Sequence, residues 1–458
     1  MQKLKLWDAT MIVMGSMIGS GIFIVSSDIM RQLGSGWWLL VVWLITGVIT
    51  VSAALCYGEL SAIFPKAGGQ YTYLTEVFGK LTGFLYGWGL FTVIQTGTIA
   101  AVAVAFSKFT AYLIPQLNDA APLFQQGSFK ITWLQILGIG IILLLTYINT
   151  RGIKSGKIIQ SVFTASKIIA LLGLIVLGLV FIKDSHLSEN LNIGTKAFQN
   201  LKGEGWTPIS GKAILGGIAA AMVGSVFSSV AWESVTFVSG EIENPKRNVV
   251  RAMVIGTASV IILYFLCNVV YLSALSRDEI AFAANDRVAV AAAEKIMGNT
   301  GTIIMAVLVM ISTFGCINGL VLSGARVFQT MAKDGLFFSS AIKNNKNNVP
   351  EKSLWLQGIW ASLLCLSGQY GDILDMISFV IVLFYMLTVF AVIWLRFKKP
   401  FIPRSYKTFL YPVTPLLYLV IGIMFCVLLI IYKPNYTWPG FILLLLGLPV
   451  YFLIRKKV

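Results

Sequence analysis

The stretch Gly15-Ser16-Met17-Ile18-Gly19-Ser20-Gly21-Ile22-Phe23 lies inside the first long apolar segment of the chain. Three glycines fall within seven residues, and each weakens an α-helix by roughly 1 kcal/mol relative to alanine. Gly15 and Gly19 also form a small-xxx-small pair, which is typical of close helix packing. Packing explains two glycines but not the cluster Gly19-Ser20-Gly21, so the pattern favours a helix that unwinds at this point.

The rest of the chain is too apolar for a soluble domain. Of its 458 residues, 57% are hydrophobic and 12% are charged, whereas soluble domains have about 25% charged residues. Apolar segments recur throughout, and most reach the roughly 20 residues that cross a bilayer as a helix. Isolated strands would leave backbone groups unpaired in lipid. We therefore expect one all-α polytopic membrane domain over residues 1–458.

The apolar segments predict twelve membrane spans: 9–32, 37–64, 81–114, 131–149, 157–183, 212–240, 249–275, 299–331, 353–368, 372–397, 409–432 and 438–454. An even number places both termini on one side of the membrane. That side holds 23 of the 35 basic residues and the other side holds 11, while Lys167 lies within a span. Cytoplasmic loops carry such an excess, so both termini are expected in the cytoplasm. The net charge of +16 then reflects these loops, not nucleic-acid binding.

The sixth predicted span contains a similar weak region, GSVFSSVAWE, from Gly224 to Glu233. If ten spans form two halves, at about 9–183 and 212–397, with two more helices at 409–454, both weak regions lie in the first helix of a half. Interrupted helices at matching positions indicate a midplane substrate site in inverted-repeat transporters. A free helix N-terminus attracts a carboxylate, and a free C-terminus offers carbonyls to an ammonium group. A free amino acid carries both.

Other kinds of function find little support in the residues. All five cysteines fall in apolar segments and the single histidine, His186, lies in a loop, so we expect no disulfide framework, no metal site and no cofactor. Paired catalytic carboxylates and a nucleophile–base pair are lacking, which disfavours an enzyme. A channel predicts a continuous polar lining instead of breaks at one depth. Residues 1–8 are too short and polar for a signal peptide.

Four stretches resemble the amino acid–polyamine–organocation superfamily, most closely its L-type amino acid transporter-like branch. They are Gly15–Phe23 (GSMIGSGIF), Tyr57–Tyr73 (YGELSAIFPKAGGQYTY), Ser239–Asn248 (SGEIENPKRN) and Gly324–Gly335 (GARVFQTMAKDG). The resemblance implies the leucine-transporter fold, in which two inverted repeats of five helices and two additional helices make twelve. It also implies that helices 1 and 6 are broken.

The resemblance further implies a substrate site at the two breaks. Backbone groups would meet the substrate carboxylate at Ser20, Gly21 and Ile22, and its ammonium group at the carbonyls of Met17, Phe227 and Val230. Phe227 also matches an aromatic gate, although without the resemblance an ordinary lipid- or core-facing phenylalanine would be the favoured interpretation.

The chain departs from its relatives next to this site. L-type relatives often have Ala-Tyr-Gly-Gly-Trp-Asn where this chain has Ser228–Glu233 (SSVAWE). Val230 therefore replaces a glycine. The larger side chain is expected to narrow the pocket and to disfavour bulky aromatic substrates.

Lys167 lies about 13 Å along the fifth span, at 1.5 Å per residue. A cation at this depth costs several kcal/mol unless it is paired or hydrated, which makes it a functional candidate; the alternative is a snorkelling lysine. It ends the stretch Phe163–Lys167 (FTASK), which matches a family lysine. The resemblance implies that its ammonium group replaces a sodium ion, with Ser312 and Thr313 as expected neighbours. Because burial favours the neutral form of a lysine, proton coupling is the alternative role.

Glu233 is the second deep charge. It is a candidate for binding a cationic substrate, for binding a proton or for pairing with a lysine; a structural hydrogen bond near the break is the simpler interpretation. Glu59 and Glu241 lie nearer the predicted cytoplasmic ends of spans, where inner-gate or structural roles are expected.

Together these features predict sodium-independent transport of small neutral L-amino acids across the cytoplasmic membrane by alternating access, as an exchanger or a proton-coupled carrier. A cationic amino acid or polyamine carrier that uses Glu233 is the alternative. Eukaryotic relatives that pair with a heavy chain do so through a cysteine in the loop after the third span. The corresponding loop, about 115–130, contains no cysteine. The expected partners are therefore substrate and membrane lipid, without a disulfide-linked heavy subunit.

Overall fold

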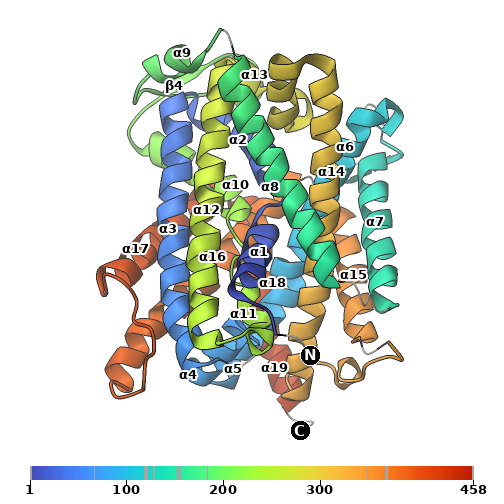
Figure 1. Ribbon diagram of the computed structural model, residues 1–458, viewed down its shortest axis with the longest axis vertical. Helices are drawn as coiled ribbons and strands as arrows, with labels where there is room; N and C mark the ends of the chain where they lie inside the picture. Colours follow the sequence, from blue (N-terminus) through green and yellow to red (C-terminus); the bar gives the residue numbers. More distant parts are fainter. Residues whose placement is uncertain are drawn as a thin grey trace.

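The computed structural model describes residues 3–65, 68–117, 122–126, 129–151, 156–182, 184–347, 349–366 and 370–455. Part of the loop 115–130 lies outside these residues, as do five of the basic residues counted above: Lys66, Lys154, Lys183, Lys456 and Lys457. In the described part the chain is predominantly helical, and most helices run along the long axis of the molecule (Figure 1).

Nine helical segments of the described residues are long and apolar enough to cross a membrane. They are Gly36–Ile63, Lys80–Leu113, Trp133–Thr150, Phe163–Phe181, Pro245–Ala274, Val288–Lys333, Ile373–Lys398, Val413–Tyr432 and Thr437–Ile454. The chain is thus a polytopic helical membrane protein. Each segment overlaps one of the predicted spans, because continuous apolar runs of this length have no other stable arrangement in lipid.

The remaining three predicted spans have shorter helices. Residues 9–32 contain most of α1 (Leu6–Met17), the 3-10 turn η1 (Gly21–Phe23) and most of α2 (Val25–Leu33). Residues 212–240 contain α10 (Lys212–Ser228) and α11 (Ser234–Phe237). The span predicted at 353–368 corresponds to α15 (Glu351–Leu366).

The other helices have the following bounds. In the first half they are α3 (Gly36–Ile63), α4 (Gln70–Phe78), α5 (Lys80–Gly89), the π-helical turn η2 (Leu90–Ile94), α6 (Gln95–Leu113), η3 (Pro115–Leu117), α7 (Trp133–Thr150), α8 (Gly156–Phe181) and α9 (Leu187–Asn192). In the second half they are η4 (Ser239–Glu241), α12 (Pro245–Ala274), α13 (Arg277–Ala281), η5 (Ala284–Asp286), α14 (Val288–Lys333), η6 (Ser339–Ala341), α16 (Tyr370–Lys398), α17 (Val413–Tyr432), α18 (Pro434–Leu445) and α19 (Gly447–Arg455).

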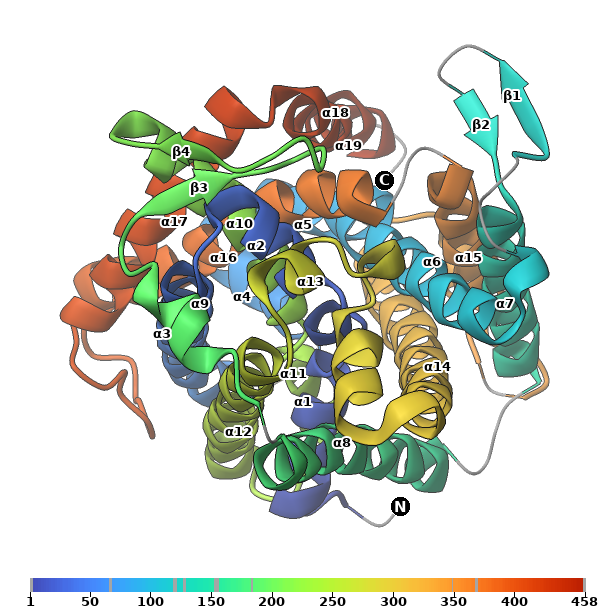
Figure 2. The ribbon, with the colours of Figure 1, turned by 90° about the horizontal axis from the view of Figure 1, so that it is seen from above.

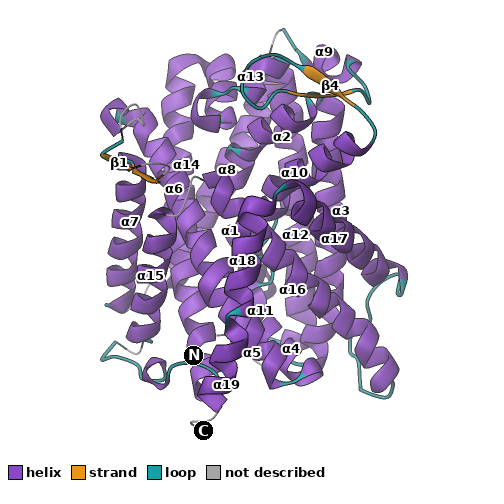
Figure 3. Cartoon of the chain, turned by 180° about the vertical axis from the view of Figure 1, so that it is seen from behind, coloured by secondary structure: helices purple, strands orange, loops and turns teal. Residues whose placement is uncertain are grey.

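Two short hairpins lie in the loops, which the all-α expectation did not include. Strand β1 (Phe124–Gln126) pairs antiparallel with β2 (Phe129–Ile131), and Phe124 lies opposite Ile131. Strand β3 (Ala197–Gln199) pairs with β4 (Thr207–Ile209) in the same way. Strand β4, α9 and α13 lie at the end of the molecule opposite the two chain termini (Figure 3).

Helices α1 and α11 lie at the centre of the helical bundle. Viewed along the long axis, α3, α12, α8, α14, α6 and α16 surround them, while α17, α18 and α19 lie at the periphery (Figure 2). Helix α1 packs against α12 and α8, and α14 packs against α6 and α8. The two short central helices are therefore held by long helices from both halves of the chain.

Glu59 near the end of α3 is a structural anchor in this arrangement. Its carboxylate is 1% exposed and accepts hydrogen bonds from Arg396 at 2.7 Å, from Arg404 at 3.1 Å and from the backbone N–H of Thr408 at 2.8 Å. A buried carboxylate is tolerable when its oxygens are paired in this way. The contacts fasten the end of α16 and the following loop to α3.

Candidate functional site

The first helix is interrupted at the glycine-rich stretch. Helix α1 ends at Met17, and the N–H of Ile18 still donates to the carbonyl of Met14. The backbone then leaves the helical conformation, makes the single turn η1 and resumes as α2 at Val25. Regular α-helical bonding is therefore absent between Met17 and Val25, which leaves backbone groups available to a ligand.

A second interruption lies between α10 and α11. Helix α10 ends at Ser228, and Ala231 has a φ of 69°. This left-handed conformation is uncommon for a residue other than glycine and marks local strain. Ala231 lies inside the weak region predicted from Gly224 to Glu233, although alanine itself carries no propensity signal for a turn.

The two interruptions contact each other. A Cβ atom placed on Gly21 would lie 1.9 Å from Oγ and 2.6 Å from Cβ of Ser228. The hydroxyl of Tyr264, from α12, lies 2.9 Å from the carbonyl oxygen of Met17 and 3.2 Å from that of Ser228, so it donates to both. One side chain thus joins the C-terminal ends of α1 and α10.

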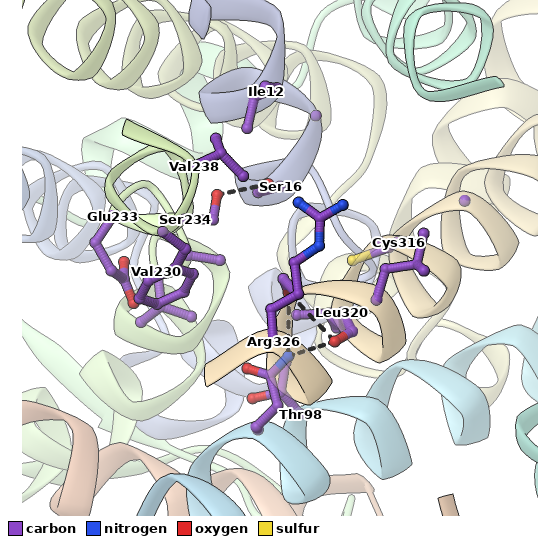
Figure 4. Close-up of a pocket in the computed structure, with 18 of the residues that line it drawn as sticks. Ile12, Ser16, Thr98, Val230, Glu233, Ser234, Val238, Cys316, Leu320 and Arg326 are labelled. Carbon is purple, nitrogen blue, oxygen red and sulfur yellow. Dashed lines mark hydrogen bonds between the residues drawn. The ribbon is translucent and has the colours of Figure 1, made fainter. Parts of the chain in front are cut away.

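A cavity of about 300 Å³, which we call the vestibule, leads from these interruptions toward the end that carries the chain termini. Ser16, Thr98, Val230, Glu233, Cys316 and Leu320 line its inner part, and Figure 4 shows how they surround the space. Leu4, Asp8, Glu241 and Arg326 line it toward the N-terminal residues.

A smaller cavity of about 20 Å³ lies at the level of the interruptions. Most of the predicted substrate residues, Met17, Ser20, Gly21, Phe227 and Val230, line it. Cys316 and Val230 line both this cavity and the vestibule.

Ile22, which was predicted beside these residues, does not line either cavity. It is fully buried, and its carbonyl oxygen accepts a hydrogen bond from Tyr271 of α12 at 3.2 Å. The Ile22 side chain therefore packs on the α12 side of the break, and only its backbone remains a candidate for the substrate site.

Lys167 is buried, with 1% exposure, and contacts the first helix directly. Its ammonium nitrogen lies 2.7 Å from the carbonyl oxygen of Gly15. Among the described residues, neither of its predicted neighbours on α14 forms a hydrogen bond with it. The hydroxyl of Thr313 donates to the carbonyl of Val309 in its own helix, and the buried hydroxyl of Ser312 has no hydrogen-bond partner among the described residues.

On the side away from the vestibule, a chain of polar contacts closes the space above the break. Ser20 and Tyr370 share a hydrogen bond of 3.1 Å, and the ammonium group of Lys108 lies 5.6 Å from the centre of the Tyr370 ring. Lys108 also pairs with Asp286 at 3.2 Å, and Arg31 at the end of α2 pairs with Asp286 at 2.7 Å. We call Arg31, Lys108 and Asp286 the ionic seal.

The charge of Asp286 is stabilised by its neighbours. Burial by itself raises the pKa of this carboxyl group, but Lys108 and Arg31 outweigh burial and hold the pKa below its usual value. Asp286 therefore stays ionised, and the seal stays paired, at neutral pH.

Several residues of this region were missed by sequence reasoning. Tyr264 and Tyr370 are two of many tyrosines in apolar spans and carry no local signal. Gln95 was detectable, because an amide inside the run VIQTGTI is unusual in a membrane helix; its side chain donates to the carbonyl of Leu320 at 2.6 Å. It follows η2, and π-helical turns are often found at functional sites.

Interrupted helices that meet beside a cavity, inside a polytopic helical membrane protein, fit the class of membrane permeases. The family model for amino acid permeases matches residues 4–453. The chain belongs to this family, within the amino acid–polyamine–organocation superfamily, and is not an enzyme.

Individual relatives span nearly the whole chain. It is 33% identical over 455 residues to the human large neutral amino acids transporter small subunit 2, covering 99% of this chain and 80% of the relative. It is 30% identical over 453 residues to the mouse Asc-type amino acid transporter 1, covering 99% and 81%. The mouse b(0,+)-type amino acid transporter 1 is 26% identical over 444 residues, covering 96% and 85%.

Proposed function

We propose that this permease transports small neutral L-amino acids across the cytoplasmic membrane independently of sodium, by alternating access. Amino acid transport follows from the family. The substrate class and the independence from sodium are argued from the site. The observation that carries it is the meeting of the two interruptions, where Gly21 contacts Ser228 and Tyr264 bonds to both helix ends.

The chemistry of this meeting point suits a free amino acid. Met17, Phe227 and Val230 are proposed to offer backbone carbonyls to the ammonium group, and Ser20, Gly21 and Ile22 to offer backbone groups to the carboxylate. A helix N-terminus such as that of α2 favours an anion. The substrate therefore needs no paired charges from side chains, which are costly to bury.

The size of the pocket supports small substrates. Val230 stands where relatives often have glycine, and the cavity at the interruptions measures only about 20 Å³ in this conformation. Phe227 packs edge-on against Tyr370 with 6.3 Å between ring centres. Phe227 is proposed to act as the gate that swings aside to admit substrate.

The architecture that we propose has twelve spans. The nine long helices, the pairs α1–α2 and α10–α11, and α15 would supply them, with both chain termini in the cytoplasm. The first five spans (9–183) and the next five (212–397) would form inverted repeats, followed by two additional helices (409–454). Helices 1 and 6 would be the broken ones.

Lys167 is proposed to take the place of a sodium ion. Its ammonium group donates to the carbonyl of Gly15 near the end of α1, as a bound cation would coordinate it, and this consumes no ion gradient. Ser312 and Thr313 complete the proposed site on α14. Proton coupling through Lys167 is the alternative role.

Glu233 favours a second candidate function, the transport of cationic amino acids or polyamines. Its carboxylate lies on the vestibule wall, where it would attract a positively charged substrate. If this is correct, Glu233→Gln should weaken lysine transport far more than alanine transport.

We propose further that the protein works without a disulfide-linked heavy subunit, although one relative is named a small subunit. All five cysteines are buried and free. A non-reducing gel of the protein purified from native membranes should show one band that reducing agent leaves unchanged. A heterodimer that reducing agent dissociates would contradict this.

The proposed function is tested in proteoliposomes that contain the purified full-length protein. A panel of labelled neutral, cationic and anionic amino acids is offered with sodium or choline, and with or without internal amino acid. Alanine and serine uptake that is equal in sodium and choline supports the proposal. A strict sodium requirement, or a preference for cationic substrates, contradicts it.

A further inference from the structure

Four buried polar atoms gather around the carboxyl group of Glu233. They are Oε2 of Glu233, the hydroxyls of Tyr57 and Tyr385, and Nε1 of Trp232. None of them makes a well-formed hydrogen bond among the described residues, although Tyr385 lies within interaction range of Glu233 and Thr388 within range of Tyr57. An unpaired buried polar group costs about 1–3 kcal/mol. Four such atoms in one place therefore favour a small ligand, because the side chains of the protein satisfy them only incompletely.

The aromatic rings of this cluster limit the size of that ligand. Tyr57 lies 4.7 Å from Trp232 and 5.8 Å from Tyr385, and Trp232 lies 5.4 Å from Tyr385, measured between ring centres. Rings this close are in van der Waals contact. No lysine or polyamine chain fits between them, which favours a proton as the ligand of this cluster.

The donors and acceptors of the cluster suit a carboxyl group that gains and loses a proton. An ionised Glu233 accepts only, and it faces an indole donor and two phenol hydroxyls. A protonated Glu233 donates as well, and each phenol oxygen can accept. Both forms can be satisfied through a buried water, which ordinarily makes about three hydrogen bonds.

Glu233 is also placed to exchange protons with solvent. It lines the vestibule beside Val230 and Ser234 (Figure 4) and lies two residues after the left-handed Ala231. A hydronium ion in the vestibule would give its proton to a carboxylate oxygen, forming an O–H bond and leaving water. The reverse step would release the proton on the other side after the interruption has rearranged.

We propose that Glu233, with Tyr57, Trp232 and Tyr385, forms a proton-binding site that couples amino acid transport to protons. This deepens the proposed function and rests on it, since it requires that amino acids are carried. It selects proton-coupled uptake over pure exchange. It also assigns Glu233 to the proton instead of a cationic substrate.

Other titratable groups surround Glu233 on each neighbouring element. The tyrosines that face it are Tyr57 on α3, Tyr86 on α5, Tyr385 on α16 and Tyr418 on α17. The vestibule adds Asp8, Glu241, Cys316 and Arg326, and Lys167 lies on α8. Tyrosine and arginine do not change charge near neutral pH. The experiment therefore compares a Glu233 variant with variants of a vestibule carboxylate and of Lys167.

The test measures alanine uptake in choline, with and without an inward proton gradient, over about pH 5 to 8. Wild-type uptake should rise about fivefold or more with the gradient, roughly 1 kcal/mol, and Glu233→Gln should abolish the rise. Tyr385→Phe should keep it with a shifted pH midpoint. Glu241→Gln, a matched carboxylate at the vestibule mouth, and Lys167→Met should each keep the relative rise.

A second readout is the infrared carbonyl band of a protonated carboxyl group, which should appear as the pH is lowered and be missing in Glu233→Gln. Gradient stimulation that persists in Glu233→Gln, or disappears only in Lys167→Met, overturns the inference. Alanine exchange without any response to the gradient in the wild type overturns it while leaving amino acid transport in place. A wild type that moves no amino acid defeats the proposed function itself.

Discussion

The two ends of the central helices differ in how they are closed. Above the interruption of the first helix, α2 is fastened by Arg31, which pairs with Asp286 at 2.7 Å while Lys108 pairs with the same carboxylate at 3.2 Å. On the other side, α1 and α11 border the vestibule of about 300 Å³. There the pair of Arg326 and Glu241, at 3.1 Å, is more than half exposed.

This difference shows which conformation the chain occupies. Partly buried ion pairs resist opening, whereas exposed pairs contribute only about 0–1 kcal/mol. The structure therefore corresponds to a state that is closed at the ionic seal and open toward the end with both termini. The alternating access that we propose requires the opposite state too, in which α2 would leave the seal and α1 would close the vestibule.

The largest effect is expected at the contact between the interruptions. Gly21→Leu should reduce alanine uptake by about 100-fold or more, because even a Cβ atom would overlap Ser228, and the resulting loss exceeds about 2.7 kcal/mol. Uptake and gel-filtration profiles of the purified variant measure function and integrity. Gly19→Ala is the control, since its Cβ would lie 3.7 Å from Cys316. Normal uptake by Gly21→Leu would remove the proposed site from this contact.

Removing the charge of Lys167 should slow transport by about tenfold or more, because the carbonyl of Gly15 loses its only described side-chain donor. That factor corresponds to about 1.4 kcal/mol. Lys167→Met keeps most of the buried volume and therefore separates charge from packing. Transport rates in sodium and in choline are compared for both proteins. A rate that the variant fully retains would contradict the role of Lys167.

The ionic seal should respond to acid in a defined direction. The pKa of Asp286 is lowered in the folded protein. Its ion pairs therefore stabilise the protein fully above about pH 4, the pKa of a free aspartate. This stabilisation is lost as the pH falls through the lowered pKa. Asp286→Asn should cost about 1–3 kcal/mol at neutral pH, measured by thermal unfolding, and the difference should shrink in strong acid.

The control for the seal is Glu189→Gln, an exposed carboxylate at the same end of the molecule. It should leave the unfolding temperature nearly unchanged. Equal stabilities of Asp286→Asn and the wild type at neutral pH would show that the two ends do not differ in the way described above.

The smallest effect is expected at the vestibule mouth. Arg326→Gln removes an exposed pair with Glu241 and should change stability by less than about 1 kcal/mol and uptake by less than about threefold. High salt should weaken even this difference by screening. A loss of stability as large as that of Asp286→Asn would mean that ion pairs also hold the vestibule mouth closed.

The apolar runs and the glycine cluster contain most of the information on the fold. They predicted the long spans and the weak points of two helices, because lipid permits few alternatives to helices and glycines weaken them. These constraints are local and therefore visible in one sequence. The grouping of Met17, Ser20 and Gly21 with Phe227 and Val230 came from the family resemblance.

Long-range contacts were not predictable in the same way. Tyr264 joins two helix ends, and Tyr370 connects Ser20 to the ionic seal, yet neither tyrosine differs from others in apolar segments. In the sequence, Asp286 is one of several polar residues of a loop, and nothing there indicates that it pairs with Arg31 and Lys108. Ala231 adopts a left-handed conformation that the surrounding packing imposes against its own preference.

Cys316 allows a direct test of amino acid binding at the interruptions, because it lines both cavities whereas the other four cysteines are buried elsewhere. The measurement is the rate at which a small maleimide alkylates Cys316 in the purified protein, followed by mass spectrometry with and without L-alanine, and Cys316→Ala serves as the blank. Binding at the interruptions predicts that L-alanine slows alkylation severalfold while D-alanine and choline do not. An alkylation rate that no amino acid of the transport panel changes would contradict a substrate site at this position.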